Sequence, residues 1–213
     1  MESTALISPS PFAFVDGKPL EDFDCRADAE AVGEALQAGV VIVDHSANGK
    51  LLVQGEAAEA VVSAVLPVGQ FVYRLRQDLY FVSTIPGGAQ EHAARLARAV
   101  TEEAVFVTVT DVTHGRSELS LLGPDCAALM SVLCGLDFGD RAFPDGTAKQ
   151  TSLAMTKQLI IRRDEIGTSA FAVIGGRSFA SYLWETTMEA GAQFGIKPVG
   201  PKALHDWRQS VST

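Results

Sequence analysis

Two short segments place a carboxylate close to an imidazole at the end of an apolar stretch. Asp44 directly precedes His45, and Asp111 lies three residues before His114. A carboxylate and an imidazole held together can act as an acid–base pair. The alternative is that each aspartate caps a turn and each histidine is solvated at a hairpin. Because the pattern occurs at equivalent strand ends in two copies, the sequence favours the structural interpretation.

Glycine pairs and cysteines are the next candidates. The glycines at 87–88 and 175–176 precede predicted helices, whose first backbone amides could hold an anion, but a strand-to-helix turn requires glycine in any case. Cys126 and Cys134 are separated by about 12 Å along one predicted helix, which is too far for a disulfide. Together with Cys25 they have no metal-ligand spacing. The sequence therefore predicts buried, reduced thiols, no metal site and no catalytic residue.

A carboxylate and a group of aromatic residues complete the candidates. Glu165 lies in the turn 164–167, where it is either a ligand-binding carboxylate or part of an exposed hairpin turn. Phe179, Tyr182 and Trp184 have helical spacing, which favours packing in the core or at an interface over a cofactor site. In the last segment, residues 204–211 contain a tryptophan and could form an exposed docking helix.

The elements that position these residues occur twice. The segment 44–55 is echoed by 111–123, and a helix-like run follows each of them. A second echo relates 80–88 to 171–176. Gly55 and Gly123 are 68 residues apart, whereas Gly88 and Gly176 are 88 apart, so the second copy contains an insertion of about 20 residues.

The order of predicted elements then defines the fold. The Asn48-Gly49 turn signal predicts a hairpin between 40–43 and 51–54. Counted from Leu51, the order is β-α-β-β-α-β, which is a ferredoxin-like unit. Counted from Ser117, it lacks one strand, and the spare strand is Val40–Asp44. We therefore predict an α+β fold with two ferredoxin-like units in a pseudo-two-fold arrangement, the second completed by the N-terminal strand. The predicted strands are 40–44, 51–54, 70–76, 79–84, 105–111, 117–122, 148–154, 158–163 and 169–174, and the predicted helices are 26–38, 56–66, 90–99, 124–133 and 178–191.

Composition limits the class of protein. The 213 residues are 47% hydrophobic, carry a formal net charge of −9 and have a pI near 4.9. This argues against nucleic-acid binding, because phosphates require a basic face. No stretch approaches the roughly 18 apolar residues of a membrane span, and the N-terminus does not resemble a signal peptide. A cytoplasmic location is predicted.

The domain organisation follows from the repeats. We expect an irregular N-terminal arm at 1–25, one module at 26–203 and a tail at 204–213, with Pro198 and Pro201 ending regular structure. The module contains the two repeats, at about 40–104 and 105–200.

Several segments carry a resemblance to a known family. The segments 107–113, 122–125, 142–148 and 196–200 resemble the folate-binding aminomethyltransferase superfamily, which includes the glycine-cleavage T-protein. More specifically, 141–144 and 177–184 resemble the gamma subunits of heterotetrameric sarcosine oxidases. The resemblance covers roughly residues 30–203 and is strongest over 105–200.

This resemblance implies a role inside a larger enzyme. It implies a non-catalytic subunit that packs against alpha, beta and delta subunits, with FAD, FMN and NAD on those partners. Such complexes demethylate an N-methyl amino acid oxidatively and pass the one-carbon unit to tetrahydrofolate. Relatives place a catalytic aspartate in the segment that corresponds to Leu66–Gln70, which contains no acid here. Glu165 matches a Glu-x-Gly turn associated with folate contact, although the aromatic residue and the second glutamate that usually follow are Thr168 and Ser169. The alternative is a free-standing, truncated folate-binding protein.

Overall fold

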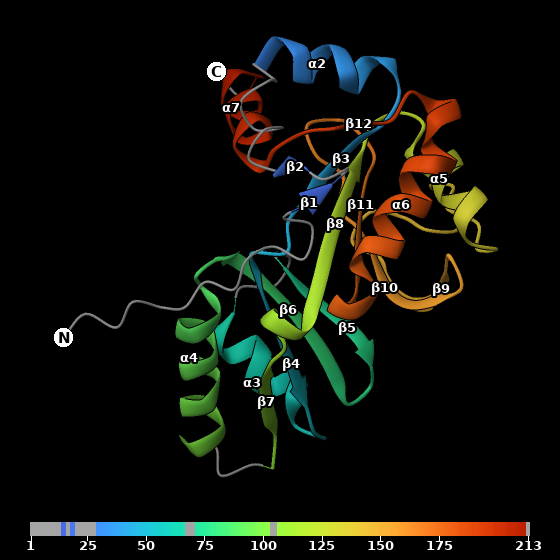
Figure 1. Ribbon diagram of the computed structural model, residues 1–213. Coiled ribbons are helices and arrows are strands. Elements are labelled where there is room, and N and C mark those ends of the chain that lie inside the picture. The colour runs from blue at the N-terminus through green and yellow to red at the C-terminus, as the bar shows by residue number, and fades with distance from the viewer. Residues whose placement is uncertain (1–13, 16–17, 20–28, 67–70, 103–105, 212–213) are drawn as a thin grey trace.

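The computed structural model describes residues 14–15, 18–19, 29–66, 71–102 and 106–211. The expected arm at 1–25 lies outside these residues except for two short paired strands, β1 (Phe14–Val15) and β2 (Lys18–Pro19). The rest forms a four-stranded and a six-stranded sheet with helices packed on them, in the lower and upper parts of Figure 1.

The four-stranded sheet and its two helices form the first predicted unit. Its strand order is β5-β6-β4-β7, with antiparallel neighbours, which is the ferredoxin-like order for a β-α-β-β-α-β chain. Leu51 and Val53 alternate along β4 with residues that face the other way, so they pack under the helices together with Leu96. The elements are β4 (Asn48–Gln54), α3 (Ala58–Val65), β5 (Val72–Arg76), β6 (Leu79–Pro86), α4 (Ala89–Glu102) and β7 (Thr108–Asp111).

The six-stranded sheet contains the second unit. Its order is β12-β3-β8-β11-β10-β9, so the N-terminal strand β3 lies antiparallel to β8, as β7 lies antiparallel to β4. The N-terminal strand therefore completes the second unit, as predicted, and β12 and β9 extend its edges. The elements are β3 (Val41–Asp44), β8 (Arg116–Leu122), α5 (Cys126–Leu133), β9 (Ala148–Leu153), β10 (Thr156–Arg162), β11 (Ala170–Gly176), α6 (Ala180–Gly191) and β12 (Lys197–Pro198), with short 3-10 turns at 113–115, 177–179 and 192–194.

The predicted hairpin at Asn48-Gly49 is wrong. Strand β3 pairs with β8 in one sheet, whereas β4 pairs with β6 and β7 in the other. Asn48 and Gly49 are the first residues of β4 and do not form a turn. The short link between β3 and β4 takes the chain from the six-stranded sheet to the four-stranded sheet, and the link between β7 and β8 takes it back. These two crossings interlock the units.

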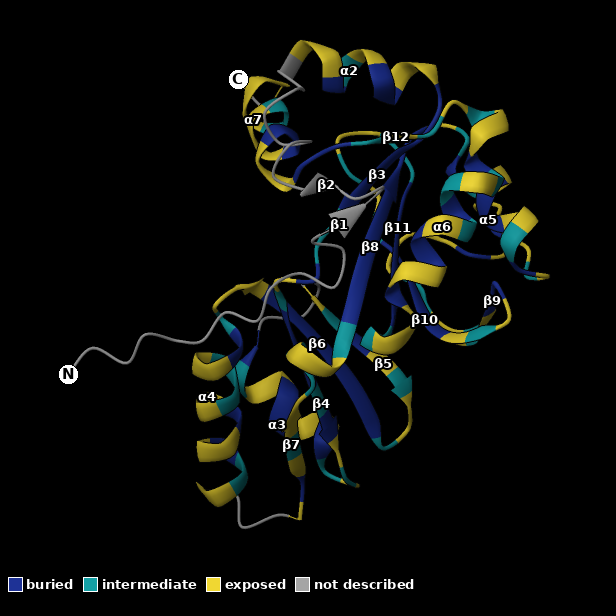
Figure 2. Cartoon of the chain, in the orientation of Figure 1, coloured by how far each residue is buried: buried dark blue, intermediate teal, exposed yellow. Residues whose placement is uncertain are grey.

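The two sheets face each other between outer layers of helices. Helices α3 and α4 cover the outer face of the four-stranded sheet, and α5 and α6 cover the six-stranded sheet. Tyr73 and Phe81 of the first sheet meet Leu159, Ile161 and Ile174 of the second in a buried cluster. Figure 2 shows the strands as mostly buried and the outer sides of the helices as exposed.

The C-terminal segment is helical, which corrects the expectation that Pro198 and Pro201 end regular structure. Pro201 is the first residue of α7 (Pro201–Val211), where its missing N–H is not needed. Helix α7 lies beside α2 (Ala29–Ala38) at the top of Figure 1. Leu204 is buried and Trp207 is partly buried beside Gly33, so α7 packs on α2 through these two side chains, whereas Val211 is 47% exposed. Helix α7 crosses the expected boundary at 203/204, and the division into domains stays a prediction.

Candidate functional site

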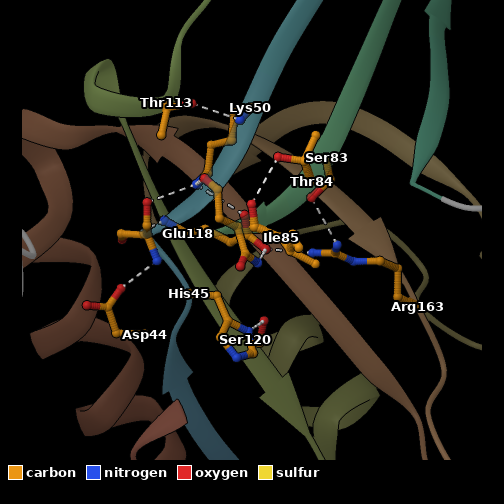
Figure 3. Close-up of polar contacts among 12 residues, drawn as sticks. Asp44, His45, Lys50, Ser83, Thr84, Ile85, Thr113, Glu118, Ser120 and Arg163 are labelled. Atoms are coloured by element: carbon orange, nitrogen blue, oxygen red, sulfur yellow. Dashed lines mark hydrogen bonds and ion pairs between the residues drawn. The ribbon is translucent and has the colours of Figure 1, made fainter. Parts of the chain in front are cut away.

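Three charged side chains from the two sheets meet between β4 and β8. Lys50 of β4 and Glu118 of β8 have fully buried side chains, and Lys50 Nζ lies 3.3 Å from Glu118 Oε2. Arg163, directly after β10, donates from Nη2 to Glu118 Oε1 over 2.7 Å. Asn48 donates to the same oxygen over 3.2 Å. Figure 3 shows how Lys50, Glu118 and Arg163 converge from both sheets.

Lys50 and Glu118 occupy equivalent positions in the two sequence repeats. The two residues are 68 positions apart, which is the offset that relates Gly55 to Gly123. Lys50 N donates to Thr113 Oγ1 and Glu118 N donates to Ser46 Oγ, both over 3.0 Å. The backbone carbonyl oxygens of Lys50 and Glu118 also accept hydrogen bonds of 2.9 Å from the backbone N–H groups of Val112 and His45. The ion pair therefore joins equivalent positions of the two repeats, with opposite charges.

The surroundings favour the charged forms of Glu118 and Arg163, whereas burial works against the charged form of Lys50. Burial raises the pKa of Glu118, but Arg163 and Lys50 outweigh it and the net effect keeps that pKa below its ordinary value. Burial outweighs the opposing effect of Glu118 and keeps the pKa of the Lys50 ammonium below its ordinary value, and Lys50 Nζ donates hydrogen bonds to the carbonyl oxygens of Ser46 and Asn48. One carboxylate facing two cations, with no exposed atom on Lys50 or Glu118, gives a substrate no access. The cluster is suited to joining the repeats and not to chemistry.

His45 corrects the expectation of a solvated histidine. It is partly buried, and its Nδ1 lies 2.7 Å from Ser120 Oγ. Its counterpart His114 is exposed, as expected. Asp44 and Asp111 each accept a bond from the backbone N–H two residues ahead, at 2.8 and 2.9 Å, which is the expected turn cap. The two aspartate–histidine segments do not form acid–base pairs.

We expect the free energy of unfolding to depend on pH because of the His45 imidazole. Burial lowers its pKa from 6.5 to about 4, opposed by Glu118 and assisted by Arg208, Arg163 and Lys50. Between these pH values the unfolded chain binds a proton that the folded chain does not. We therefore expect the free energy of unfolding to fall by up to about 3 kcal/mol as the pH drops from about 6.5 to about 4.

Urea unfolding at a series of pH values checks this expectation. In His45→Asn the decline between pH 6.5 and 5 should disappear, because most carboxylates titrate below that window. His114→Asn, which removes the exposed counterpart, should leave the decline intact. An equal decline in wild type and His45→Asn would show that another group is responsible.

Glu165 lies in the exposed hairpin turn that the sequence predicted. Ile166 and Gly167 both have positive φ, at 48° and 73°, and Thr168 closes the turn by exchanging backbone bonds with Glu165. The Glu165 carboxylate accepts from Arg208 Nε over 2.8 Å and pairs with Arg208 Nη2 at 2.5 Å. Helix α7 therefore engages the one carboxylate that the sequence associated with folate.

The remaining candidates are the two cysteines of α5 and its end, and the three aromatic residues at 179, 182 and 184. Cys126 and Cys134 are buried and form no disulfide, and burial raises the pKa of the Cys126 thiol. Trp184 is buried in the core, whereas Phe179 and Tyr182 are 51% and 44% exposed. Within the described ranges, no group of three or more His, Cys, Asp and Glu side chains could hold a metal, and no helix is long and apolar enough to cross a membrane.

Sequence reasoning missed the Lys50–Glu118–Arg163 cluster. Lysine, glutamate and arginine in strands normally indicate an exposed face, and these residues are far apart in the chain. The available signal was the alignment of the two repeats, which places Lys50 opposite Glu118 at one offset.

Comparison with known proteins identifies the family. The family model described as the GCVT N-terminal domain matches residues 69–211, which is more than half of the chain. The chain belongs to this family. The match confirms the resemblance to aminomethyltransferases that the sequence carried. It begins just before β5 of the first unit and covers the second unit except for β3.

Curated relatives include both aminomethyltransferases and sarcosine oxidase subunits. The chain is 26% identical over 129 residues to an aminomethyltransferase of Alkaliphilus metalliredigens, covering 61% of this chain but 34% of that protein. It is 23% identical to the sarcosine oxidase subunit alpha of Rhizobium meliloti, covering 76% of this chain and 19% of that protein. With the sarcosine oxidase subunit gamma of Corynebacterium sp. (strain P-1), identity is 29% over 171 residues, 80% of this chain and 71% of that protein. The chain thus spans about a third or less of the first two relatives, and most of the third.

Solved structures share the fold. One chain of the heterotetrameric sarcosine oxidase from Corynebacterium sp. U-96 matches with a TM-score of 0.64 and 22% identity, over 82% of this chain and 99% of that one. The glycine cleavage aminomethyltransferase from Bartonella henselae matches with a TM-score of 0.68 and 19% identity, over 84% of this chain and 53% of that one. These matches confirm the predicted α+β fold.

Proposed function

We propose that this chain is the gamma-type subunit of a sarcosine-oxidase-type complex and has no catalytic residues of its own. The observation that carries the proposal is the breadth of one match. The similarity extends over 71% of a sarcosine oxidase subunit gamma, but over only 19% of a subunit alpha and 34% of an aminomethyltransferase. A chain equivalent to the gamma subunit would be part of an assembly that oxidises an N-methyl amino acid and passes the one-carbon unit to tetrahydrofolate.

The site geometry supports a non-catalytic role. The carboxylate of Glu118 is enclosed by Lys50 and Arg163, and Glu165 is engaged by Arg208. Neither carboxylate is placed to exchange protons with a substrate. The segment Leu66–Gln70, to which the resemblance would assign the catalytic aspartate, contains no acid.

The partners would be the alpha, beta and delta subunits, and FAD, FMN and NAD would be bound by them. Exposed aromatic side chains on this chain, those of Phe179 and Tyr182, are candidates for the contact. An obligate interface of this kind would bury about 2,000 Å² or more in total.

The first test uses the full chain purified alone. We expect no bound flavin and no oxidase activity with sarcosine, measured by absorbance and by oxygen consumption. Stoichiometric flavin on the isolated chain would refute the assignment of the flavins to the partner subunits.

The alternative is a free-standing folate-binding protein in which Glu165 contacts the ligand. Calorimetric titration with tetrahydrofolate distinguishes the two. Micromolar binding to the isolated chain that is lost in Glu165→Ala but kept in Glu185→Ala, an exposed helix position, would favour the alternative. The proposed function expects no such binding, because Arg208 already neutralises Glu165.

A further inference from the structure

A cavity of about 480 Å³ opens between the two sheets. Its apolar walls come from both sheets, with Leu52, Leu75 and Phe81 on one side and Leu159 on the other. Phe81 and Leu159 belong to the buried cluster between the sheets, so the cavity continues the space that this cluster fills. A volume of this size is typical of sites that bind small organic molecules.

The charge of the lining differs from that of the rest of the chain. Arg116 at the start of β8 and Lys157 on β10 both line the cavity, and among the described lining residues none is acidic. The chain as a whole has 26 acidic and 17 basic residues. No hydrogen bond or ion pair engages either cation within the part of the chain that the structure describes, although most other arginines there have such a partner. The two charges are therefore available to a ligand.

The cavity is separate from both sites described above. Lys50 and Glu118 are not among its lining residues. Lys157 lies near the start of β10, whereas Glu165 lies in the turn beyond its end at Arg162. Lys157 and Arg162 are five residues apart in this strand, which corresponds to roughly 17 Å, so the cavity cations and the folate candidate lie towards opposite ends of β10.

We propose that this cavity binds a small organic carboxylate with an apolar body. The apolar walls would bury the body of the ligand, and Arg116 and Lys157 would pair with its carboxylate. Apolar walls with a few polar groups that fix orientation are the general composition of small-molecule sites. The inference does not depend on the proposed function, because it uses only the lining of this cavity.

Two fluorescent probes that differ in one group test the proposal with the full chain. Dansylglycine carries an aromatic body and a carboxylate, and dansylamide carries the same body without the charge. We expect dansylglycine to bind with a stoichiometry of one and about tenfold more tightly than dansylamide. In the double variant Arg116→Gln/Lys157→Gln, dansylglycine should bind no better than dansylamide.

A matched control separates local from general charge effects. Arg98→Gln/Lys197→Gln removes the same charge from exposed positions that do not line the cavity, and it should leave both affinities unchanged. Gln150→Trp, at an exposed lining position, should abolish binding of both probes by filling the cavity. Circular dichroism verifies that each variant is folded. Equal affinity for the two probes, no effect of the Arg116/Lys157 variant, or no binding to wild type would overturn the proposal.

Discussion

Glu118→Ala should lower the free energy of unfolding by about 3–5 kcal/mol. The change leaves Lys50 and Arg163 facing each other without a counter-charge, and Lys50 has no exposed atom through which water could solvate it. Removing one partner of a buried pair is costly because the remaining charge stays desolvated. Urea unfolding followed by circular dichroism at neutral pH measures the change.

Two further variants separate the loss of charge from the loss of volume. Lys50→Met/Glu118→Leu removes the two fully buried charges and keeps the volume. It leaves Arg163, whose side chain is 18% exposed, without its carboxylate, so it should recover only part of the stability lost in Glu118→Ala. Asp206→Ala breaks the exposed pair with Lys202 and should cost no more than about 1 kcal/mol. If Glu118→Ala were as mild as Asp206→Ala, the cluster would not hold the repeats together.

Gly123→Ala should be the second most destabilising change, at about 3 kcal/mol or more. Gly123 has a φ of 135°, and an added Cβ would lie 2.0 Å from the carbonyl oxygen of Gly39, just before the exchanged strand β3. Gly55, 68 residues earlier, has a φ of 148°, and its Cβ would lie 2.5 Å from the oxygen of Phe106. We expect Gly55→Ala to be destabilising for the same reason.

Gly115→Ala is the matched control for both glycines. A Cβ at Gly115 would meet no atom within 4 Å, and its φ is not in the left-handed region. The free energy of unfolding should change by less than about 0.5 kcal/mol. Equal effects at Gly115 and Gly123 would contradict the close contact between the backbones of Gly123 and Gly39.

The repeat made most of the fold predictable from the sequence. The 68-residue offset, together with the missing strand after Ser117, identified Val40–Asp44 as the strand that completes the second unit. The same region also misled prediction. Asn48-Gly49 is a strong local hairpin signal, but pairing of β3 with β8 and of β4 with β6 and β7 overrides it. Local turn preference does not report which sheet a strand joins.

The candidate site was less predictable, because burial of charge is a tertiary property. Lys50 and Glu118 look like exposed strand residues in the sequence, and only the facing of the two sheets buries them. The ion pair of Glu165 with Arg208 joins residues 43 apart in the chain, and nothing in the local sequence of either segment indicates that α7 lies beside the turn at Glu165. Asp44 and Asp111, in contrast, act on backbone two residues away, so local sequence predicted their caps.

The proposed role is tested most directly by recovering the tagged chain, at its native level, from the cells that produce it. We expect a stoichiometric complex with a larger flavin-containing polypeptide, and we expect this complex to consume oxygen when sarcosine or another N-methyl amino acid is added. A chain that elutes alone, with the N-methyl amino acid oxidase activity in other fractions, would contradict the account.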